Sequence, residues 1–275
     1  MKELLLAIFT ICMGIMYPAN TNAQYSISGQ QSTEELYADF IIVEEETPPM
    51  VENIKNPYRF KATDIIIPAT FIGLGVAGLE LKPLKHVNQD VTNALWGNGH
   101  KKYKIDDFTE YLPAIANYGL NLCGVKGLHD YIDLTIITGT AYLMMAAIVY
   151  PTKDFVYSPR PAGDPRVNSF PSGHTAWAFT GAEIMRREFW HVSPWIGVSG
   201  YLVATGTAFM RLYNGAHWLT DVLAGAGIGI LCAEAAYWLY PTITKHLFPK
   251  RYNSNIFISP TASKNSFGIA ASISF

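Results

Sequence analysis

Charged residues are scarce in this sequence of 275 residues. Lys, Arg, Asp and Glu make up 15% of it, against roughly a quarter in ordinary soluble domains, and the formal net charge is −2. A nearly neutral chain has no electrostatic attraction for nucleic acid, so we expect no nucleic-acid partner. Cysteine is scarce too. Of the three present, Cys123 and Cys232 lie in apolar stretches, where a thiol packs as a small hydrophobe, which argues against a disulfide framework.

Apolar residues, by contrast, make up 49% of the chain. Residues 1–23 have the pattern of a secretory signal peptide: Lys2 precedes a short apolar run, and Thr21-Asn22-Ala23 forms a small-residue cleavage site. An uncleaved anchor helix is the alternative. Residues 24–60 are acidic and contain Pro48-Pro49, which predicts a solvated polar arm.

Six apolar segments follow, with lengths that favour helices over strands. They cover roughly residues 65–81, 108–125, 131–151, 175–189, 193–213 and 217–240. Gly225 and Gly229, four residues apart, share a helix face, and such spacing lets helix backbones approach closely. The series of Gly200, Ala204 and Ala208 has the same spacing. The predicted fold is all-α, a bundle of about six core helices in a domain spanning residues 61–250.

The tail, residues 251–275, follows a different pattern. Apolar residues alternate from Phe267 to Phe275 after a polar turn at Ser263 to Ser266. This period of two predicts a terminal β-hairpin. The pattern also resembles the last strand of an outer-membrane barrel, but one hairpin cannot close a barrel. We therefore expect the hairpin to pack against the helical body.

Polar residues form three islands at the ends of the apolar segments. An up-and-down bundle brings the end of the third segment, the start of the fourth, the end of the fifth and the start of the sixth to one face. The islands are Lys153 with Arg160, then Ser172, Gly173 and His174, and finally Arg211, His217 and Asp221.

The residue types in these islands suit phosphate chemistry. Lysine and arginine side chains donate to phosphate oxygens, and a helix that starts at Gly173 directs its backbone N–H groups at an anion. Asn214-Gly215 predicts a turn that lets the last helix start near His217. His217 and Asp221 share a helix face, so the carboxylate can hold Nδ1–H while Nε2 attacks phosphorus. His174 can then protonate a leaving group.

Each island alone has an ordinary structural explanation, such as a helix cap, a loop arginine or a surface ion pair. Their occurrence together and in order is what indicates a site. Lys-x6-Arg-Pro, Pro-Ser-Gly-His and Arg-x5-His-x3-Asp resemble the three-part signature of the type 2 phosphatidic acid phosphatases. Their superfamily includes bacterial acid phosphatases and vanadium haloperoxidases. The family usually has Ser before the arginine of the third part, whereas this chain has Met210.

The resemblance implies roles for these residues. His217 would form a phosphohistidine, Asp221 would orient it, and His174 would act as general acid and then as general base. Lys153, Arg160, Ser172, Gly173 and Arg211 would bind the phosphate. We expect no metal and no other cofactor, because the sequence offers no obvious metal cluster.

The resemblance leaves the substrate open. A phosphorylated envelope lipid such as phosphatidate, polyprenyl pyrophosphate or lipid A is the first expectation, a small soluble ester the second, and haloperoxidase chemistry or a non-enzymatic scaffold the outsiders. We expect an exported, inner-membrane-associated protein whose site faces the periplasm. If every segment crossed the membrane, that site would face the cytoplasm, so we expect residues 108–125 or 175–189 not to span. The sequence does not set the oligomeric state.

Overall fold

The computed structural model describes residues 61–163 and 165–249 and the backbone of residues 256–263 and 266–273. The signal peptide and the acidic arm predicted for residues 1–60 lie outside the described residues. The described helices are α2 (Ala62–Glu80), α3 (Lys82–Leu95), α4 (Asp106–Thr109), α5 (Leu112–Leu122), α6 (Tyr131–Phe155), α7 (Gly173–Phe189), α8 (Pro194–Tyr213) and α9 (Leu219–Leu247).

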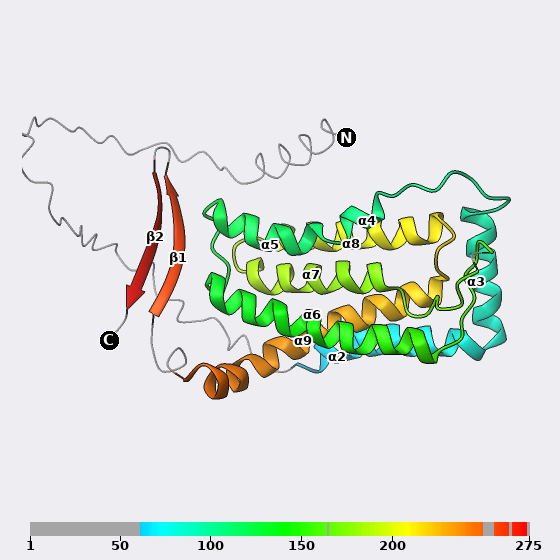
Figure 1. Cartoon of the computed structure of the whole chain (residues 1–275), viewed down its shortest axis with the longest axis horizontal. Helices are drawn as coiled ribbons and strands as arrows, with labels where there is room; N and C mark the ends of the chain where they lie inside the picture. The colour runs from blue at the N-terminus through cyan, green and yellow to red at the C-terminus, as the bar shows by residue number, and fades with distance from the viewer. Residues whose placement is uncertain (1–60, 164, 250–255, 264–265, 274–275) are drawn as a thin grey trace, which may run out of the picture. The chain divides into compact units, whose positions relative to one another are not determined.

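The predicted all-α fold is confirmed. Six of the eight described helices, α2 and α5 to α9, run alongside one another as an up-and-down bundle (Figure 1). The last of them, α9, is central, because α2, α6 and α7 all pack against it. One core cluster, which includes Leu134, Ile184 and Tyr237, joins α6, α7 and α9, and all three side chains are fully buried. A second cluster joins α7, α8 and α9 around Phe179, Ala204 and Val222.

The small residues of α9 allow close packing, as predicted. A Cβ atom added to Gly225 would lie 2.4 Å from the carbonyl oxygen of Ser172, and one added to Gly229 would lie 2.5 Å from that of Ala176. On the other side of α9, a Cβ on Gly78 of α2 would lie 2.3 Å from Thr220. Any side chain at these positions would push the helices apart, so α2 and α7 are held against the start of α9.

The predicted helix over residues 108–125 is wrong in one respect: the structure divides it into α4 and α5. Pro113 lies in the first turn of α5, where its missing N–H costs nothing. A continuous helix would instead set the proline ring against the carbonyl group of Thr109. Pro151 and Pro241, in contrast, lie inside α6 and α9 without ending them.

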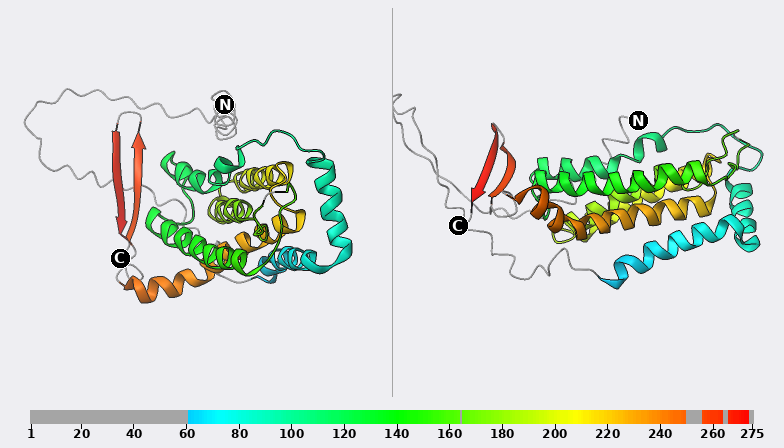
Figure 2. Two further views of the ribbon diagram at one scale, coloured as in Figure 1. Left: turned by 45° about the vertical axis from the view of Figure 1, so that its right-hand side comes forward. Right: turned by 60° about the horizontal axis from the view of Figure 1, so that its bottom comes forward.

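One helix, α3, was not among the predicted segments. It crosses the end of the bundle at a steep angle to the other helices (Figures 1 and 2). Its buried residue Asn88 accepts a hydrogen bond from the backbone N–H of Thr220, at 3.1 Å, and donates to the Thr220 hydroxyl, at 2.8 Å. A side chain of α3 therefore caps the first turn of α9.

Two strands follow the helices, β1 (Ile256–Ser263) and β2 (Ser266–Ile273). They pair antiparallel, with Ser263 opposite Ser266. Residues 250–255, 264–265 and 274–275 lie outside the described part of the chain, so the predicted hairpin and its packing stay a prediction.

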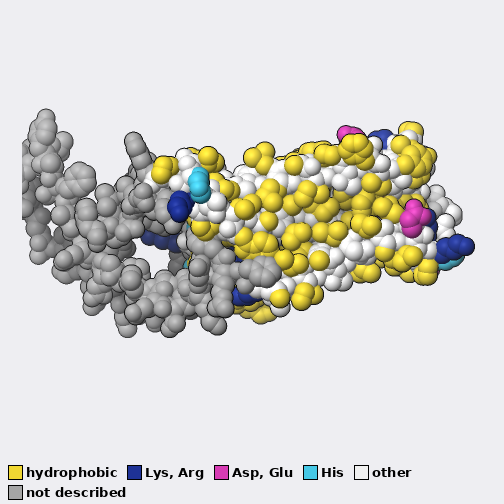
Figure 3. Space-filling view, turned by 90° about the horizontal axis from the view of Figure 1, so that it is seen from below, with side chains coloured by type: hydrophobic (Ala, Val, Ile, Leu, Met, Phe, Trp, Pro, Cys, Tyr) yellow, Lys and Arg dark blue, Asp and Glu magenta, His cyan; other side chains and the backbone are white. Residues whose placement is uncertain are grey.

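The surface of the bundle is apolar over a wide area. Hydrophobic side chains cover the face seen from below, with few charges along its middle (Figure 3). Leu143 on α6 and Leu202 on α8 are 73% and 68% exposed. Among the described helices, α2, α6 and α9 are each long and apolar enough to cross a bilayer. These features make the protein a membrane-associated one.

Candidate active site

A cavity of about 300 Å³ opens at the end of the bundle where α6 and α8 end and α7 begins. Six of the eight predicted site residues line it: Lys153, Arg160, Gly173, His174, Arg211 and His217. Gly215, in the turn before α9, has a positive φ of 59° that suits glycine. The structure thus brings the three islands together, and the roles assigned to their residues stay predictions.

His217 is buried, and Nδ1 is its engaged nitrogen. Nδ1 lies 3.3 Å from the hydroxyl oxygen of Ser169 and 3.7 Å from Oδ2 of Asp221. Burial, reinforced by the charges of Arg211 and Lys153, lowers the pKa of His217 to about 3 although Asp221 opposes the shift. The imidazole is therefore neutral near pH 7, as a nitrogen nucleophile must be.

Asp221 does not line this cavity. Its Oδ2 accepts hydrogen bonds from the Ser169 hydroxyl, at 2.5 Å, and from the backbone N–H of Trp218, at 2.9 Å. The predicted proximity of His217 and Asp221 is present, but a serine hydroxyl lies between them. Nδ1 of His217 and Oδ2 of Asp221, at 3.7 Å, are too far apart for a direct hydrogen bond.

His174 also lines the cavity and is about one third exposed. Its Nε2 lies 3.1 Å from Oδ1 of Asp107 and 3.7 Å from Oε1 of Glu110. Burial and the charge of Arg211 lower the pKa of His174, while Asp107 opposes the shift. Burial raises the pKa of Glu110 to about 7. The sequence predicted no carboxylate partner for His174, and α4 supplies one.

The three predicted cations are held in two ways. The Lys153 ammonium donates to the carbonyl oxygens of Asn168, at 3.1 Å, and Ser169, at 3.5 Å. Arg160 donates to a carbonyl oxygen too, that of Ala216, at 3.4 Å. Arg211 instead pairs with the buried carboxylate of Asp106, 105 residues away in the chain. Its Nε makes no hydrogen bond with the described residues and is buried next to the cavity.

Of the middle island, Gly173 and His174 line the cavity and Ser172 does not. Gly173 is the first residue of α7 and lines it, so the helix N-terminus points where an anion would lie. Ser172 is fully buried and does not line it, and its hydroxyl lies 2.9 Å from that of Thr175. Met210 is half-buried and lies outside the cavity wall.

Several cavity residues were missed by the sequence reasoning. They are Glu110, Tyr111, Tyr150, Arg166 and Trp177 at the wall, and Asp106, Asp107 and Ser169 behind it. The aromatic members give the wall an apolar side, where Tyr111 meets Trp177 edge-on at 5.5 Å. The adjacent acidic pair, Asp106-Asp107, was a usable signal, since no other two acidic residues are neighbours in residues 61–249.

Asp106, Asp107 and His174 offer ligand atoms within 4.8 Å of one another, a spacing that a metal ion could use. Asp106, however, already pairs with Arg211 and accepts a hydrogen bond from Asn214. His174 and Asp107 also pair with each other. An ion there would have to displace these partners and lie beside the arginine.

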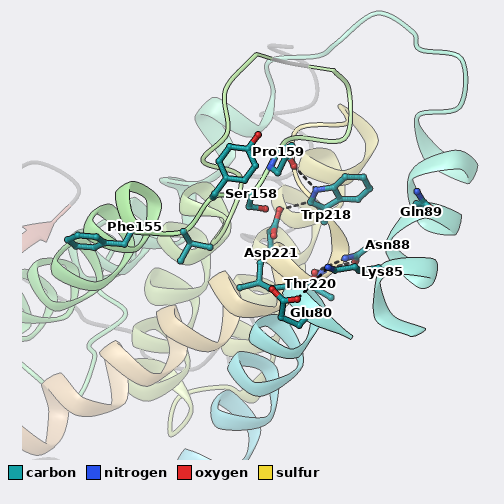
Figure 4. Close-up of a pocket in the computed structure, with 14 residues that line it drawn as sticks. Glu80, Lys85, Asn88, Gln89, Phe155, Ser158, Pro159, Trp218, Thr220 and Asp221 are labelled. Carbon is teal, nitrogen blue, oxygen red and sulfur yellow. Dashed lines mark hydrogen bonds and ion pairs between the residues drawn. The ribbon is translucent and has the colours of Figure 1, made fainter. Parts of the chain in front are cut away.

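A second cavity, of about 620 Å³, borders the loop that precedes α9 (Figure 4). Asp221 and Trp218 face it together with Asn88 of α3, and the Trp218 indole donates to the carbonyl oxygen of Pro159 at 2.8 Å. The carboxylate therefore belongs to the wall of this cavity, whereas His217 belongs to the wall of the first.

Comparisons with known proteins agree with the motif. Residues 134–245 match the model of the PAP2 superfamily. A lipid A 1-phosphatase of Porphyromonas gingivalis is 35% identical over 158 residues, which are 57% of this chain and 35% of that protein. A probable lipid phosphate phosphatase 4 of Arabidopsis thaliana is 34% identical over 101 residues, 32% of this chain and 30% of that protein. The chain thus spans about a third of the length of these curated relatives.

Two solved structures are similar as well. The crystal structure of Aquifex aeolicus LpxE is 26% identical, with a TM-score of 0.40, over 55% of this chain and 94% of that one. A PAP2 type phosphatidylglycerolphosphate phosphatase from Bacillus subtilis is 17% identical, with a TM-score of 0.43, over 65% and 96%. Residues 134–245 contain all three parts of the motif, from Lys153 to Asp221. The match to the PAP2 superfamily model therefore covers the whole of the predicted motif.

Proposed function

We propose that the protein is a phosphatase that releases phosphate from phosphate monoesters or pyrophosphates of envelope lipids through a phosphohistidine on His217. The observation that carries the proposal is the pairing of a neutral, buried His217 with a second histidine and three cations at one cavity. The names of the curated relatives, a lipid A 1-phosphatase and a lipid phosphate phosphatase, support it.

The proposed reaction has two displacements at phosphorus. In the first, the lone pair of His217 Nε2 forms a bond to phosphorus, the ester P–O bond breaks, and His174 gives its proton to the leaving oxygen. In the second, His174 takes a proton from water, the water oxygen attacks phosphorus, and the P–N bond breaks to release phosphate. Lys153, Arg160 and Arg211 neutralise charge on the phosphoryl oxygens in both steps.

An apolar groove supports a lipid substrate. A cavity of about 820 Å³ is lined by residues of α2, α7, α8 and α9, and Leu212 in its wall follows Arg211 in the sequence. Apolar chains can lie along such a wall while the phosphate reaches the cations. A small soluble ester would not use it. Phosphate release from a matched panel, a long-chain lipid phosphate against glycerol phosphate and nitrophenyl phosphate, tests this. Equal kcat/KM on all three would overturn the lipid assignment but not the phosphatase.

We propose further that hydrolysis needs no divalent metal. The phosphate-binding groups of the cavity are cations, whereas a metallophosphatase clusters carboxylates around its ions. Activity should survive EDTA and be inhibited by vanadate, a mimic of five-coordinate phosphorus. Loss in EDTA that a divalent ion restores would overturn this, and Asp106→Asn would then show whether the group beside His174 holds that ion. Bromide oxidation without phosphatase activity would establish the haloperoxidase alternative. A protein with neither activity would support the alternative of a non-enzymatic scaffold.

We propose that the protein is exported and that its site faces the periplasm, on the basis of the signal-like residues 1–23 and the resemblance. The C-terminal end of α2 lies beside Thr220, so the start of α2 and the site lie at opposite ends of that helix. An exported N-terminal segment and a periplasmic site therefore agree only if α2 does not cross the membrane, and we include this in the proposal. An impermeant maleimide tests the orientation in whole cells. Tyr157→Cys at the site end should be labelled when Cys12 and Cys123 are replaced by Ser, and the exposed Cys123 of the native chain should not. The opposite pattern would place the site in the cytoplasm.

A further inference from the structure

The strongest unassigned feature is the hydroxyl group of Ser169, which lies between the two residues expected to pair directly. Its oxygen lies 2.5 Å from Oδ2 of Asp221 and 3.3 Å from Nδ1 of His217, while those two atoms are 3.7 Å apart. Ser169 is fully buried. Both of its contacts are therefore shielded from water, and hydrogen bonds in such a low-dielectric environment are stronger than in water.

The number of protons fixes the direction of both hydrogen bonds. An ionised carboxylate only accepts, and 2.5 Å is the length of an O–H···O⁻ bond, so the hydroxyl proton points at Asp221. A serine has only one such proton, so towards His217 its oxygen acts as acceptor. Nδ1 of His217 must then carry the ring proton. Nε2 is left with its lone pair, which is the tautomer that can attack phosphorus.

Two backbone contacts fix this hydroxyl group in place. The backbone N–H of Ser169 donates to the carbonyl oxygen of Ser158 at 2.8 Å, and that of Ser158 donates to the carbonyl oxygen of Val167 at 2.7 Å. The Ser169 carbonyl oxygen accepts from Lys153. On the other side, the Trp218 N–H holds Oδ2 of Asp221. The serine therefore connects the loop before α7, a phosphate-binding cation and the start of α9.

We propose that Ser169 is a positioning residue, which transmits the charge of Asp221 to His217 and holds the histidine in its nucleophilic tautomer. This inference rests on the proposed role of His217. It differs from a direct pair in one respect: the carboxylate and the imidazole share no direct hydrogen bond, and the hydroxyl group lies between them and bonds to both.

The kinetics of four variants test the proposal. Ser169→Ala should lower kcat by about 10–100-fold, as expected when an imidazole loses its orienting partner, while inhibition by inorganic phosphate changes less than about twofold because the cations are untouched. In an Asp221→Asn background the same change should cost almost nothing more, because residues that act through one another are not additive. Ser158→Ala is the matched control: this buried serine makes no side-chain hydrogen bond among the described residues, and its backbone contacts remain.

Tautomer measurement tests the inference without turnover. In ¹⁵N-histidine-labelled protein, the His217 signals, assigned by their loss in His217→Gln, should show the proton on Nδ1. In Ser169→Ala the proton should move to Nε2 in most molecules. If the native chain hydrolyses no phosphate ester but has this tautomer, the proposed function fails and the inference stands. Three results would each overturn the inference on Ser169. They are an unchanged kcat in Ser169→Ala, additive losses in the double variant, and a proton on Nε2 in the native protein.

Discussion

The two ends of the helical bundle both contain buried ionisable groups, but they pair them differently. At the end away from the site, arginines meet carboxylates: Arg186 pairs with Glu183 and Glu234, and Arg187 pairs with Glu234. The His129 imidazole and the Tyr237 hydroxyl, in turn, both contact the buried carboxylate of Glu188, at 2.7 and 2.5 Å.

At the site end, Arg211 pairs with Asp106, but the Lys153 ammonium contacts carbonyl oxygens, which carry no full charge, and His217 is neutral. The far end compensates its charges within the protein, which costs least when each buried ion has a partner. The site end keeps positive charge beside a cavity. This difference underlies our proposal that the far end stabilises the bundle and the site end binds an anion.

Replacing the two buried histidines should give the sharpest contrast between the ends. His217→Ala should abolish turnover of aryl and alkyl phosphates alike, a loss of about 10⁴-fold or more, since it removes the proposed nucleophile. His129→Gln, at the far end, should lower the melting temperature in detergent and leave the kcat of the folded protein unchanged. Aryl phosphatase activity that survives His217→Ala would contradict the assignment of the nucleophile.

The other site histidine should separate leaving groups. A general acid matters little when the leaving group is already a stable anion, so His174→Ala should keep measurable turnover of nitrophenyl phosphate and lose about 10²–10⁴-fold on an alkyl ester. Steady-state rates on the two substrates measure the ratio directly. Equal losses on both would show that His174 binds phosphate and does not donate the proton.

Neutralising one charge at each end tests the comparison itself. Lys153→Gln should lower kcat/KM about 10–100-fold and leave the melting temperature nearly unchanged, because its partners are carbonyl groups. Glu234→Gln should leave kcat/KM unchanged and cost roughly 2–4 kcal/mol of stability, because two arginines lose a buried partner. Thermal unfolding and initial rates, measured on both variants, provide the comparison. A stability loss in Lys153→Gln as large as that in Glu234→Gln would remove the distinction between the ends.

The sequence predicted the bundle well because long apolar segments identify helices by length alone. It missed α3 because that helix is largely polar and exposed, and its buried contact with α9 is made by an asparagine, Asn88. It missed the break before α5, although Pro113 marks it.

In the candidate site, too, some features could be predicted from the sequence and others could not. Lys153, His174 and His217 were found because local spacing and the resemblance identify them. The contact between Asp107 and His174 joins residues 67 positions apart, and that between Ser169 and Asp221 joins residues 52 apart, so no local pattern could reveal either. Only the folded chain shows which polar groups share a proton.

The smallest expected effect concerns the pH profile. His174 must be protonated to act as an acid, so kcat/KM on an alkyl ester falls as the pH rises through the pKa of His174. Burial and Arg211 lower that pKa, and Asp107 opposes them. Asp107→Asn removes the opposing charge, so the alkaline limb should move to lower pH. Since Asp107 is about half exposed and water screens it, we expect a shift of about 0.5–1 unit.

Asp154→Asn is the control, because it removes the same charge from an exposed position on α6 near Lys153 and should move the limb much less. Raising the salt concentration should move the alkaline limb of the native protein to lower pH, towards that of Asp107→Asn, since screening weakens a half-exposed ion pair. Glu110 also faces His174 at 3.7 Å, and its raised pKa of about 7 keeps it largely neutral at lower pH. Below that pH Asp107, which hydrogen-bonds His174, and Asp106, which pairs with Arg211, are the carboxylates that raise the pKa of His174. An alkaline limb that stays in place in Asp107→Asn would show that Asp107 and His174 are not coupled.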